Sequence, residues 1–364
     1  MVITNAEQLK KYETSTRQWQ GIPGVERTKK GRIFVTWYSG GEVEQLGNHS
    51  LVVKSDDGGK RFSEPIIVVD VGTEARSYDP CLWIDPLGRL WFIWAEFPNN
   101  AVKFVRCDNP DAETLTWSEE KILGYDVMLN KPIVTSDGAW LFPCAVWKKG
   151  LLACGCGSDG TRPTGAHTYV SYDQGETFSL LGTAVAKDRG YDEHMLLEKN
   201  DGSLECYIRT KYGIAVSESR DGGKTWSAGV DCGLGGPNSR FFIGRLSSGN
   251  LLLINHHRFA GRNNLTAMIS RDDGKTFEGF LLLDERADVS YPDAVEGNDG
   301  FIYVVYDRER GAKYNPEFNY DYHAREILMA KVTEEDILNG CLTNPESSLK
   351  MLVNKVILKG KNDQ

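Results

Sequence analysis

The chain has 364 residues, of which 40% are hydrophobic, so it can bury a substantial core as two average domains or as one large all-β domain. Its net charge of -9 argues against nucleic acid or an anionic membrane as a partner, because both attract dense positive charge. No apolar run approaches the ~20 residues needed to span a bilayer. We therefore expect neither nucleic acid nor a membrane as a partner.

The first residues, MVITNAEQLKKYE, lack the apolar core of a signal peptide, which predicts a cytoplasmic protein unless a secretion leader has been removed. Eight cysteines are scattered along the chain, and the close pair Cys154 and Cys156 lacks the spacing of a zinc site. We expect reduced thiols, no metal and no cofactor.

Six short glycine-containing turns recur between runs rich in β-branched and aromatic residues, such as RIFVTW and FIYVVY. This composition is typical of strands that enter and leave a hairpin. The turns contain Gly31, Gly88, Gly138, Gly202, Gly249 and Gly300. Helical periodicity is confined to a short segment near TEEDIL at 333–338.

A second motif, Ser-x-Asp-x-Gly-x-x-aromatic, occurs four times. The copies are SDDGGKRF at 55–62, SYDQGETF at 171–178, SRDGGKTW at 219–226 and SRDDGKTF at 270–277. We expect each to form the turn between the third and fourth strands of a repeat. The Asp would accept backbone N–H bonds, the Gly would take a positive φ, and the aromatic ring would pack between neighbouring repeats. This interpretation makes the motif structural and not catalytic.

A repeat of about fifty residues with four strands predicts one blade of a β-propeller. The fold prediction is therefore an all-β, six-bladed β-propeller of four-stranded antiparallel blades, forming a single domain over residues 1–364. Two stacked β-sandwiches are the alternative, but they do not require a period that runs unbroken from residue 31 to residue 300. The predicted blades span about 20–70, 71–125, 126–185, 186–235, 236–285 and 286–350.

Polar residues recur at equivalent places in these repeats. If each first strand runs from the mouth of the propeller down to its glycine turn, the residue nine places before the glycine lies near the mouth. These residues are Ile22, Asp79, Leu129, Glu193, Arg240 and Tyr291. The second strand returns to the mouth at Tyr38, Arg209, His256 to Arg258, and Asp307 with Arg308. We expect a polar binding site there, at the end opposite to the Ser-x-Asp turns.

At these residues the chain resembles the sialidase superfamily, whose six-bladed propellers carry such turns, called Asp boxes. The run DEHMLLEKNDGSLECYIRT is similar to the family segment that bears a glutamate and an arginine, which selects Glu193 and Arg209. The segments HHRFAGRNN and VSYPD select Arg262 and Tyr291. The resemblance implies that Tyr291 is the nucleophile, paired with Glu193, and that the two arginines bind the substrate carboxylate. It places an acid in the loop YSGGEVEQLGNHS, where Glu44 or Glu42 fills the role.

The chain departs from the family at one arginine. The family has Arg-Ile-Pro near the N-terminus, whereas this chain reads QGIPG, with Gly21 in the arginine position. Either another cation completes the carboxylate site, with Arg76, Arg240 and Arg308 as candidates, or the ligand is not an ordinary sialoside. Asp79, Asn130 and Lys131 are further predicted ligand contacts at the rim.

The resemblance implies an exo-acting glycosidase that releases a terminal sialic acid or a related acidic sugar. A neutral tyrosine suits this substrate, because a carboxylate nucleophile would meet like charge at the anomeric centre. Two alternatives remain: a non-catalytic glycan-binding propeller, and a lyase or glycosidase that acts on another uronic or ulosonic acid. In each case the partner is a sialylated or other acidic-sugar glycan, and the oligomeric state is not predicted.

Overall fold

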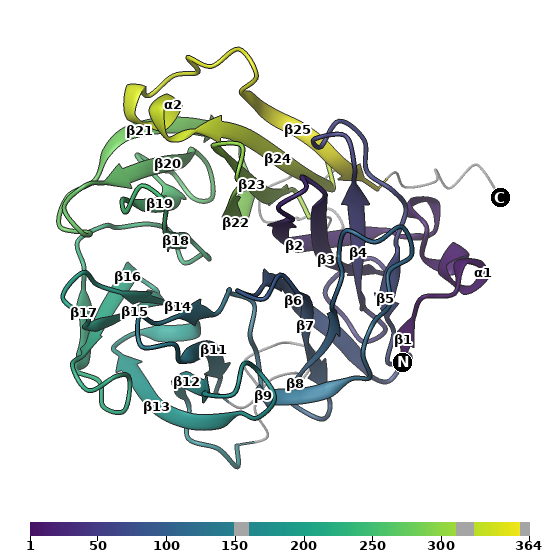
Figure 1. Ribbon diagram of the computed structural model, residues 1–364, viewed down its shortest axis with the longest axis horizontal. Helices are drawn as coiled ribbons and strands as arrows, with labels where there is room; N and C mark the ends of the chain where they lie inside the picture. Colours follow the sequence, from purple (N-terminus) through teal and green to yellow (C-terminus); the bar gives the residue numbers. More distant parts are fainter. Residues whose placement is uncertain (149–159, 311–323, 357–364) are drawn as a thin grey trace.

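Antiparallel β-sheets arranged around a common centre make up the computed structural model of the chain, which describes residues 1–148, 160–310 and 324–356 (Figure 1). The prediction of an all-β chain is confirmed. No helix in these described ranges is long and apolar enough to cross a membrane.

The first two sheets comprise residues from the N-terminal third of the chain. One contains β2 (Trp19–Arg27), β3 (Ile33–Gly40), β4 (His49–Ser55) and β5 (Ile67–Val69), with β1 (Val2–Ile3) paired to β5. The next contains β6 (Arg76–Ile84), β7 (Leu90–Phe97), β8 (Ala101–Cys107) and β9 (Lys121–Tyr125).

The next eight strands form one continuous sheet. Its first half contains β10 (Ile133–Val134), β11 (Trp140–Val146), β12 (Gly165–Ser171) and β13 (Ser179–Ala186). Its second half contains β14 (Arg189–Glu198), β15 (Leu204–Thr210), β16 (Gly213–Ser219) and β17 (Ala228–Asp231). A short parallel pairing of β13 with β17, at Val185 with Ala228 and Ala186 with Gly229, joins the halves.

Two four-stranded sheets complete the ring. One contains β18 (Phe242–Arg245), β19 (Leu251–His256), β20 (Leu265–Ser270) and β21 (Glu278–Asp284). The other contains β22 (Val289–Glu296), β23 (Phe301–Arg308), β24 (Glu326–Thr333) and β25 (Ser348–Lys355). Because β22 of this last sheet packs beside β2 of the first, the ring closes on itself (Figure 1).

Helices contribute little to the described ranges. They are α1 (Ala6–Leu9), the 3-10 turns η1 (Lys10–Tyr12) and η2 (Thr14–Thr16), and α2 (Glu334–Asn339). The predicted TEEDIL helix is α2, which begins with a capping box between Thr333 and Asp336 and ends at Gly340 in the left-handed conformation. The N-terminal helix was not predicted, since one turn is too short to produce a periodic pattern.

The expectation of six separate four-stranded sheets needs two corrections. The first sheet gains a fifth strand, because β1 pairs with the outer edge of β5. The third and fourth repeats share one eight-stranded sheet, because the outer strands β13 and β17 approach closely enough to pair. Both additions use backbone groups of outer strands that would otherwise be unpaired sheet edges.

The four Asp boxes form the turns between the third and fourth strands of their repeats, and they share one hydrogen-bond pattern. In the copy at 219–226, Ser219 Oγ accepts the N–H of Gly223 (2.9 Å) and donates to Asp221 (2.8 Å). Asp221 accepts the backbone N–H of Thr225 (2.9 Å) and its hydroxyl (2.6 Å). These bonds hold the pKa of Asp221 down at about 2, the Thr225 hydroxyl contributing most. The Asp221 carboxylate therefore makes its hydrogen bonds within the turn.

The aromatic residue of each box packs between neighbouring repeats. Phe178, for example, lies in one hydrophobic cluster with Trp91 and Phe104 of the second sheet and Phe142 of β11. Its ring centroid lies 5.2 Å from that of Phe142 and 5.7 Å from that of Phe104. This contact links neighbouring repeats at the periphery.

Replacing Asp221 by alanine should lower the melting temperature by several degrees, because the turn loses its hydrogen-bond acceptor. The cavity described below lies at the other end of the strands, so turnover per folded molecule should not change. Thermal unfolding and kinetics on the same preparation check this, with Glu218→Ala as a control on the same strand. Loss of turnover in a normally melting protein would contradict the structural role of the motif.

Candidate active site

The innermost strands of four sheets each contain a β-bulge at the same place. The bulges fall between Gly21 and Gly24, Tyr78 and Cys81, Asp192 and Met195, and Ser290 and Asp293. Ile22, Asp79, Glu193 and Tyr291 lie in them with positive φ, between 40° for Glu193 and 61° for Ile22. They are four of the six residues predicted to lie near the mouth. Since a bulge redirects a side chain, all four line one cavity of about 310 Å³.

Proline follows three of these bulge residues, in Ile22-Pro23, Asp79-Pro80 and Tyr291-Pro292. Proline lacks a backbone N–H and is tolerated inside a sheet mainly at bulges and edges. The prolines are therefore a sequence signal for the bulges that place the cavity residues.

Tyr291, Glu193 and Arg209 form the centre of the cavity. Tyr291 Oη donates to Glu193 Oε1 (3.0 Å), and Arg209 Nη1 donates to Tyr291 Oη (3.0 Å). The same Arg209 nitrogen lies 2.6 Å from Glu193 Oε2, and both side chains are almost completely buried. The structure thus brings together three residues that the sequence placed on three different strands.

Burial, followed by the negative charge of Glu193, raises the pKa of Tyr291 to about 12. The phenol is therefore neutral at physiological pH and needs a base before it can attack an electrophile. Glu193 already accepts its hydrogen bond, so a carboxylate is in position to take the proton.

Arg262 lies beside the same tyrosine, with its guanidinium carbon 5.4 Å from the ring centroid. Asn238 holds this arginine and Arg209 together. Its backbone carbonyl accepts from Nη2 of Arg209 (2.9 Å) and of Arg262 (3.1 Å), and its side-chain oxygen accepts from Arg209 Nε (2.8 Å). Asn238 was not predicted, because it precedes the short strand β18 in an irregular segment without periodicity.

Arg310 is a second cavity residue that was not predicted from the sequence. Its guanidinium carbon lies 4.7 Å from the Tyr291 ring centroid, and its Nη1 donates to Glu44 Oε1 (2.9 Å). Burial alone lowers the pKa of Arg310, but the charges of Asp307 and Glu44 outweigh it and raise that pKa above its ordinary value. Counting forward from the glycine turn selected Arg308, the last residue of β23. Arg310 lies two residues further on, beyond the end of the strand, so the count did not select it.

The cavity is also lined by Arg76, Tyr78, Asp79 and Glu44. The guanidinium carbon of Arg76 lies 4.2 Å from the Tyr78 ring centroid. Glu44 lines the cavity, whereas the alternative acid Glu42 is not among the described lining residues. Burial, reinforced by the charges of Glu193 and Glu44, raises the pKa of Asp79 to about 7. Asp79 and Glu44, which have different environments, therefore face the cavity together with Glu193.

The buried carboxyl of Asp79 predicts a pH effect on stability. Between about pH 4 and pH 7 the unfolded chain releases this proton while the folded protein keeps it, so stability falls as pH rises through this window. Asp79→Asn removes this titration, and asparagine tolerates positive φ. Its stability relative to the parent protein should increase by up to about 4 kcal/mol across the window. Denaturant unfolding at pH 4 and pH 8 measures the difference, and parallel curves would contradict the prediction.

Three predicted ligand contacts, Asn130, Lys131 and Arg240, do not line this cavity. Arg240 is fully buried and donates to Asn130 Oδ1 (2.7 Å) and to two backbone carbonyls. Lys131 Nζ lies 2.8 Å from Glu26 and 3.1 Å from Asp293. These groups instead bind backbone carbonyls, most of them in the innermost strands β2, β6 and β14.

Arg308 likewise lies outside the cavity lining. Its guanidinium lies 2.8 Å from Glu309 and 3.3 Å from Glu326. Of the cations expected to complete the carboxylate site, only Arg76 lines the cavity.

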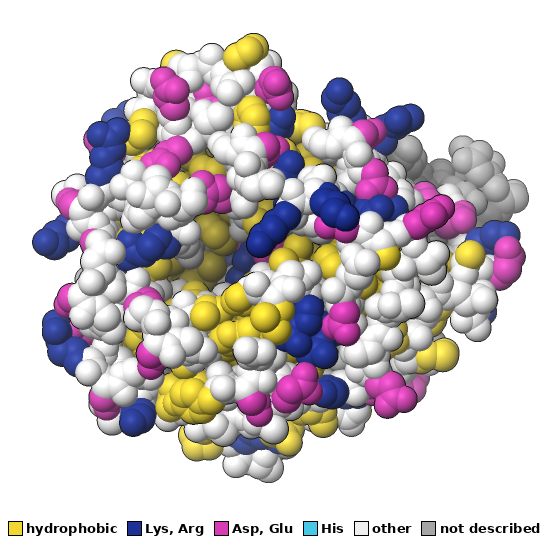
Figure 2. All heavy atoms as spheres, in the orientation of Figure 1, with side chains coloured by type: hydrophobic (Ala, Val, Ile, Leu, Met, Phe, Trp, Pro, Cys, Tyr) yellow, Lys and Arg dark blue, Asp and Glu magenta, His cyan; other side chains and the backbone are white. Residues whose placement is uncertain are grey.

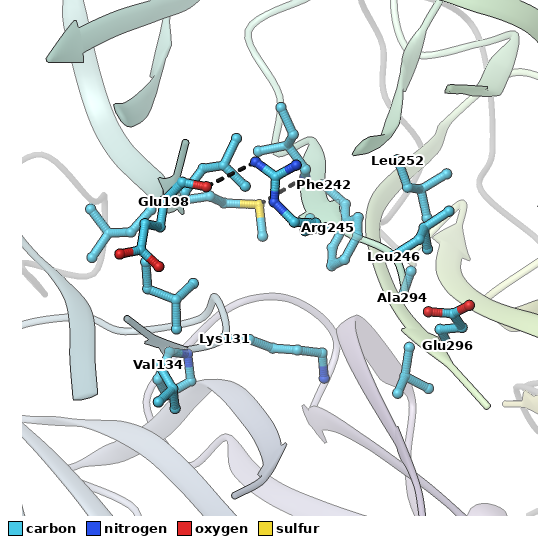
Figure 3. A pocket seen from close by; sticks show the side chains of 17 residues that line it. Lys131, Val134, Glu198, Phe242, Arg245, Leu246, Leu252, Ala294 and Glu296 are labelled. Carbon is cyan, nitrogen blue, oxygen red and sulfur yellow. Dashed lines mark hydrogen bonds between the residues drawn. The ribbon is translucent and has the colours of Figure 1, made fainter. Parts of the chain in front are cut away.

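A second cavity, of about 350 Å³, lies at the other end of the innermost strands (Figure 3). The face shown in Figure 2 is hollowed at its centre, where hydrophobic side chains are visible. The charged groups at this cavity already have partners: Arg245 donates to the carbonyls of Glu198 (2.9 Å) and Gly249 (2.8 Å), and Glu296 accepts from Ser247. Most of its other described lining residues are apolar, whereas most of those of the first cavity are charged or polar.

The described chain is therefore an all-β ring with a buried Tyr–Glu–Arg cluster at the end opposite to its Asp boxes. Residues 31–304 match the family model of the BNR repeat-like domain. The chain belongs to this family, because the match covers well over half of its length. A search among curated proteins found no match.

Solved structures show the same fold. A protein of unknown function from Dyadobacter fermentans superposes with a TM-score of 0.63 at 19% identity, covering 81% of this chain and 92% of that one. A Hadza microbial sialidase has a TM-score of 0.63 at 21% identity, covering 80% and 64%. The leech intramolecular trans-sialidase has a TM-score of 0.63 at 16% identity, covering 91% and 70%. At these identities the likeness concerns the fold alone.

Proposed function

We propose that the ring of sheets is a six-bladed β-propeller and that its buried cavity is the active site of a sialidase-like, exo-acting glycosidase. In this proposal β10–β13 and β14–β17 are two blades joined at their outer edges. The substrate is a glycan that ends in sialic acid or a related acidic sugar. The observation that carries the proposal is the hydrogen-bonded cluster of Tyr291, Glu193 and Arg209, which lines the cavity.

The proposed reaction uses the phenol as a nucleophile. Tyr291 Oη attacks the anomeric carbon while its proton passes to Glu193, and the leaving oxygen takes a proton from Glu44. Water then attacks the anomeric carbon while Glu44 takes a proton from it, the C–O bond to Tyr291 breaks, and the tyrosine oxygen recovers its proton from Glu193. Sialidases are known exceptions to the use of two carboxylates in glycoside hydrolysis, because of their tyrosine nucleophile.

Arg209 and Arg262 are the proposed ligands of the substrate carboxylate. Asn238 occupies one nitrogen of Arg262 and two of Arg209, which fixes the orientation of both guanidinium planes. Arginine binds carboxylates through paired N–H groups, so a fixed plane restricts the sugar to one orientation. The anomeric carbon next to that carboxylate would then face Tyr291.

The experiment that tests this function is a panel of acidic-sugar glycosides, with the released sugars identified by mass. A hydrolase releases the free sugar, and an intramolecular transferase releases an anhydro sugar that is lighter by one water. A lyase instead yields an unsaturated product that absorbs in the near ultraviolet. Binding without any release would favour a non-catalytic glycan-binding protein. The proposal fails if no acidic-sugar glycoside is cleaved.

A further inference from the structure

We propose that Arg310 is the third cation of the carboxylate site, in the place of a side chain at position 21. This inference rests on the proposed function and assigns a specificity-determining role to a residue outside the repeat pattern. It also gives a reason for the glycine at position 21.

The space above Gly21 is filled by Arg310. A Cβ atom added to Gly21 would overlap Cδ of Arg310 and would lie 2.6 Å from its Cγ. The φ angle of Gly21 lies outside the left-handed region, so the backbone does not require glycine there. The absence of a side chain at this position is therefore explained by the arginine that crosses β2 at this point.

Arg310 is held in this position by acids on both sides. Its Nη1 donates to Glu44 Oε1 (2.9 Å), and its Nε lies 3.7 Å from Asp307 Oδ2. Asp307 in turn accepts the backbone N–H of Ile22 (2.8 Å), so the first and last sheets meet here. The side chain remains 20% exposed, which leaves part of the guanidinium accessible from the cavity.

Three guanidinium groups therefore surround one phenol. Arg209 bonds the hydroxyl of Tyr291, while Arg262 and Arg310 lie near its ring at 5.4 Å and 4.7 Å from the centroid. A substrate carboxylate bound beside Tyr291 would therefore lie near positively charged groups from three different sheets. Such a site favours a ligand with a carboxylate next to the reacting carbon.

Because Arg310 donates a hydrogen bond to Glu44, a substrate carboxylate and Glu44 would share, or compete for, the guanidinium group of Arg310. Replacing Glu44 by glutamine removes that competing charge. We therefore expect Glu44→Gln to bind a carboxylate inhibitor as tightly as the parent protein or more tightly, although it turns over substrate poorly.

The test compares binding of 2,3-dehydro-2-deoxy-N-acetylneuraminic acid and of its methyl ester by calorimetry. Arg310→Ala should weaken binding of the acid by about 30-fold or more, since removing one partner of a desolvated charge pair typically costs 2–5 kcal/mol. Binding of the ester should change little. The control is Arg106→Ala, because Arg106 has similar exposure (18%) and also pairs with two carboxylates, Asp108 and Glu176, but lies away from the cavity.

A further set of variants moves the arginine from position 310 to position 21. Gly21→Arg alone should weaken binding of the acid, because the new arginine side chain would overlap that of Arg310. The double variant Gly21→Arg with Arg310→Ala should recover most of the lost affinity, since a cation returns to the same place from the other strand. Circular dichroism and thermal melting of each variant show whether it is folded.

The outcomes separate the two proposals. If Arg310→Ala binds the acid as the parent protein does, while Arg262→Ala loses it, the role of Arg310 is overturned and the proposed function stands. The role of Arg310 is equally overturned if the double variant is folded but binds no better than Arg310→Ala. If the parent protein binds neither probe and cleaves no acidic-sugar glycoside, both proposals are overturned.

Discussion

Replacing Tyr291 by phenylalanine should reduce kcat on an aryl sialoside by about a thousandfold or more, because the variant loses the proposed nucleophile. The ring would keep its place in the core, and Glu193 would keep its ion pair with Arg209. The melting temperature should therefore change by only a few degrees.

A matched control is Tyr303→Phe. Tyr303 is also buried and its hydroxyl also bonds a carboxylate, at Asp299 (2.9 Å), but it lies at the opposite end of its sheet. This variant should keep the turnover of the parent protein. Near-normal turnover of folded Tyr291→Phe would reject Tyr291 as the nucleophile.

Arg209→Ala should destabilise the protein by about 3–5 kcal/mol, because it leaves the carboxylate of Glu193 buried without its cation. The second change Glu193→Gln should restore much of this stability, since the buried negative charge is then gone. Neither the single nor the double variant should turn over substrate, because both lack the carboxylate ligand Arg209.

Denaturant unfolding and kcat/KM on the same preparations test this pair. If the single variant were as stable as the parent protein, the buried ion pair would contribute nothing to folding. If the double variant kept turnover, Arg209 and Glu193 would have no part in the reaction. The double variant should therefore regain stability without regaining turnover.

Much of the site could be predicted from the sequence, because the fold repeats one local pattern. Glycine turns mark the hairpins, and counting back from them selects Asp79, Glu193 and Tyr291. These residues share a cavity because each lies at the same bulge of its strand. Arg209 follows from the return of the second strand.

The same counting selected Arg240, which lies deeper than expected. Its strand, β18, begins only at Phe242, and no bulge turns the arginine toward the cavity. Its guanidinium instead bonds carbonyls of Pro23 and Leu129 in the middle of the ring. A repeat pattern predicts the height of a residue along its strand, but not whether unpaired carbonyls from other strands will bind it.

By itself the sequence determined the all-β class and the Asp-box turns, and its repeat pattern placed Tyr291, Glu193 and Arg209 near the mouth, since these depend on local periodicity and on residue types. Arg262 and the role of each residue came from the resemblance to sialidases. Only the tertiary structure decided that Arg310 occupies the space left by Gly21, and that Asn238 aligns Arg209 with Arg262. Such contacts join residues far apart in the chain through segments without a repeat. Closure of the ring brings the last sheet against the first, and the resulting distances follow from packing and not from any pattern in the sequence.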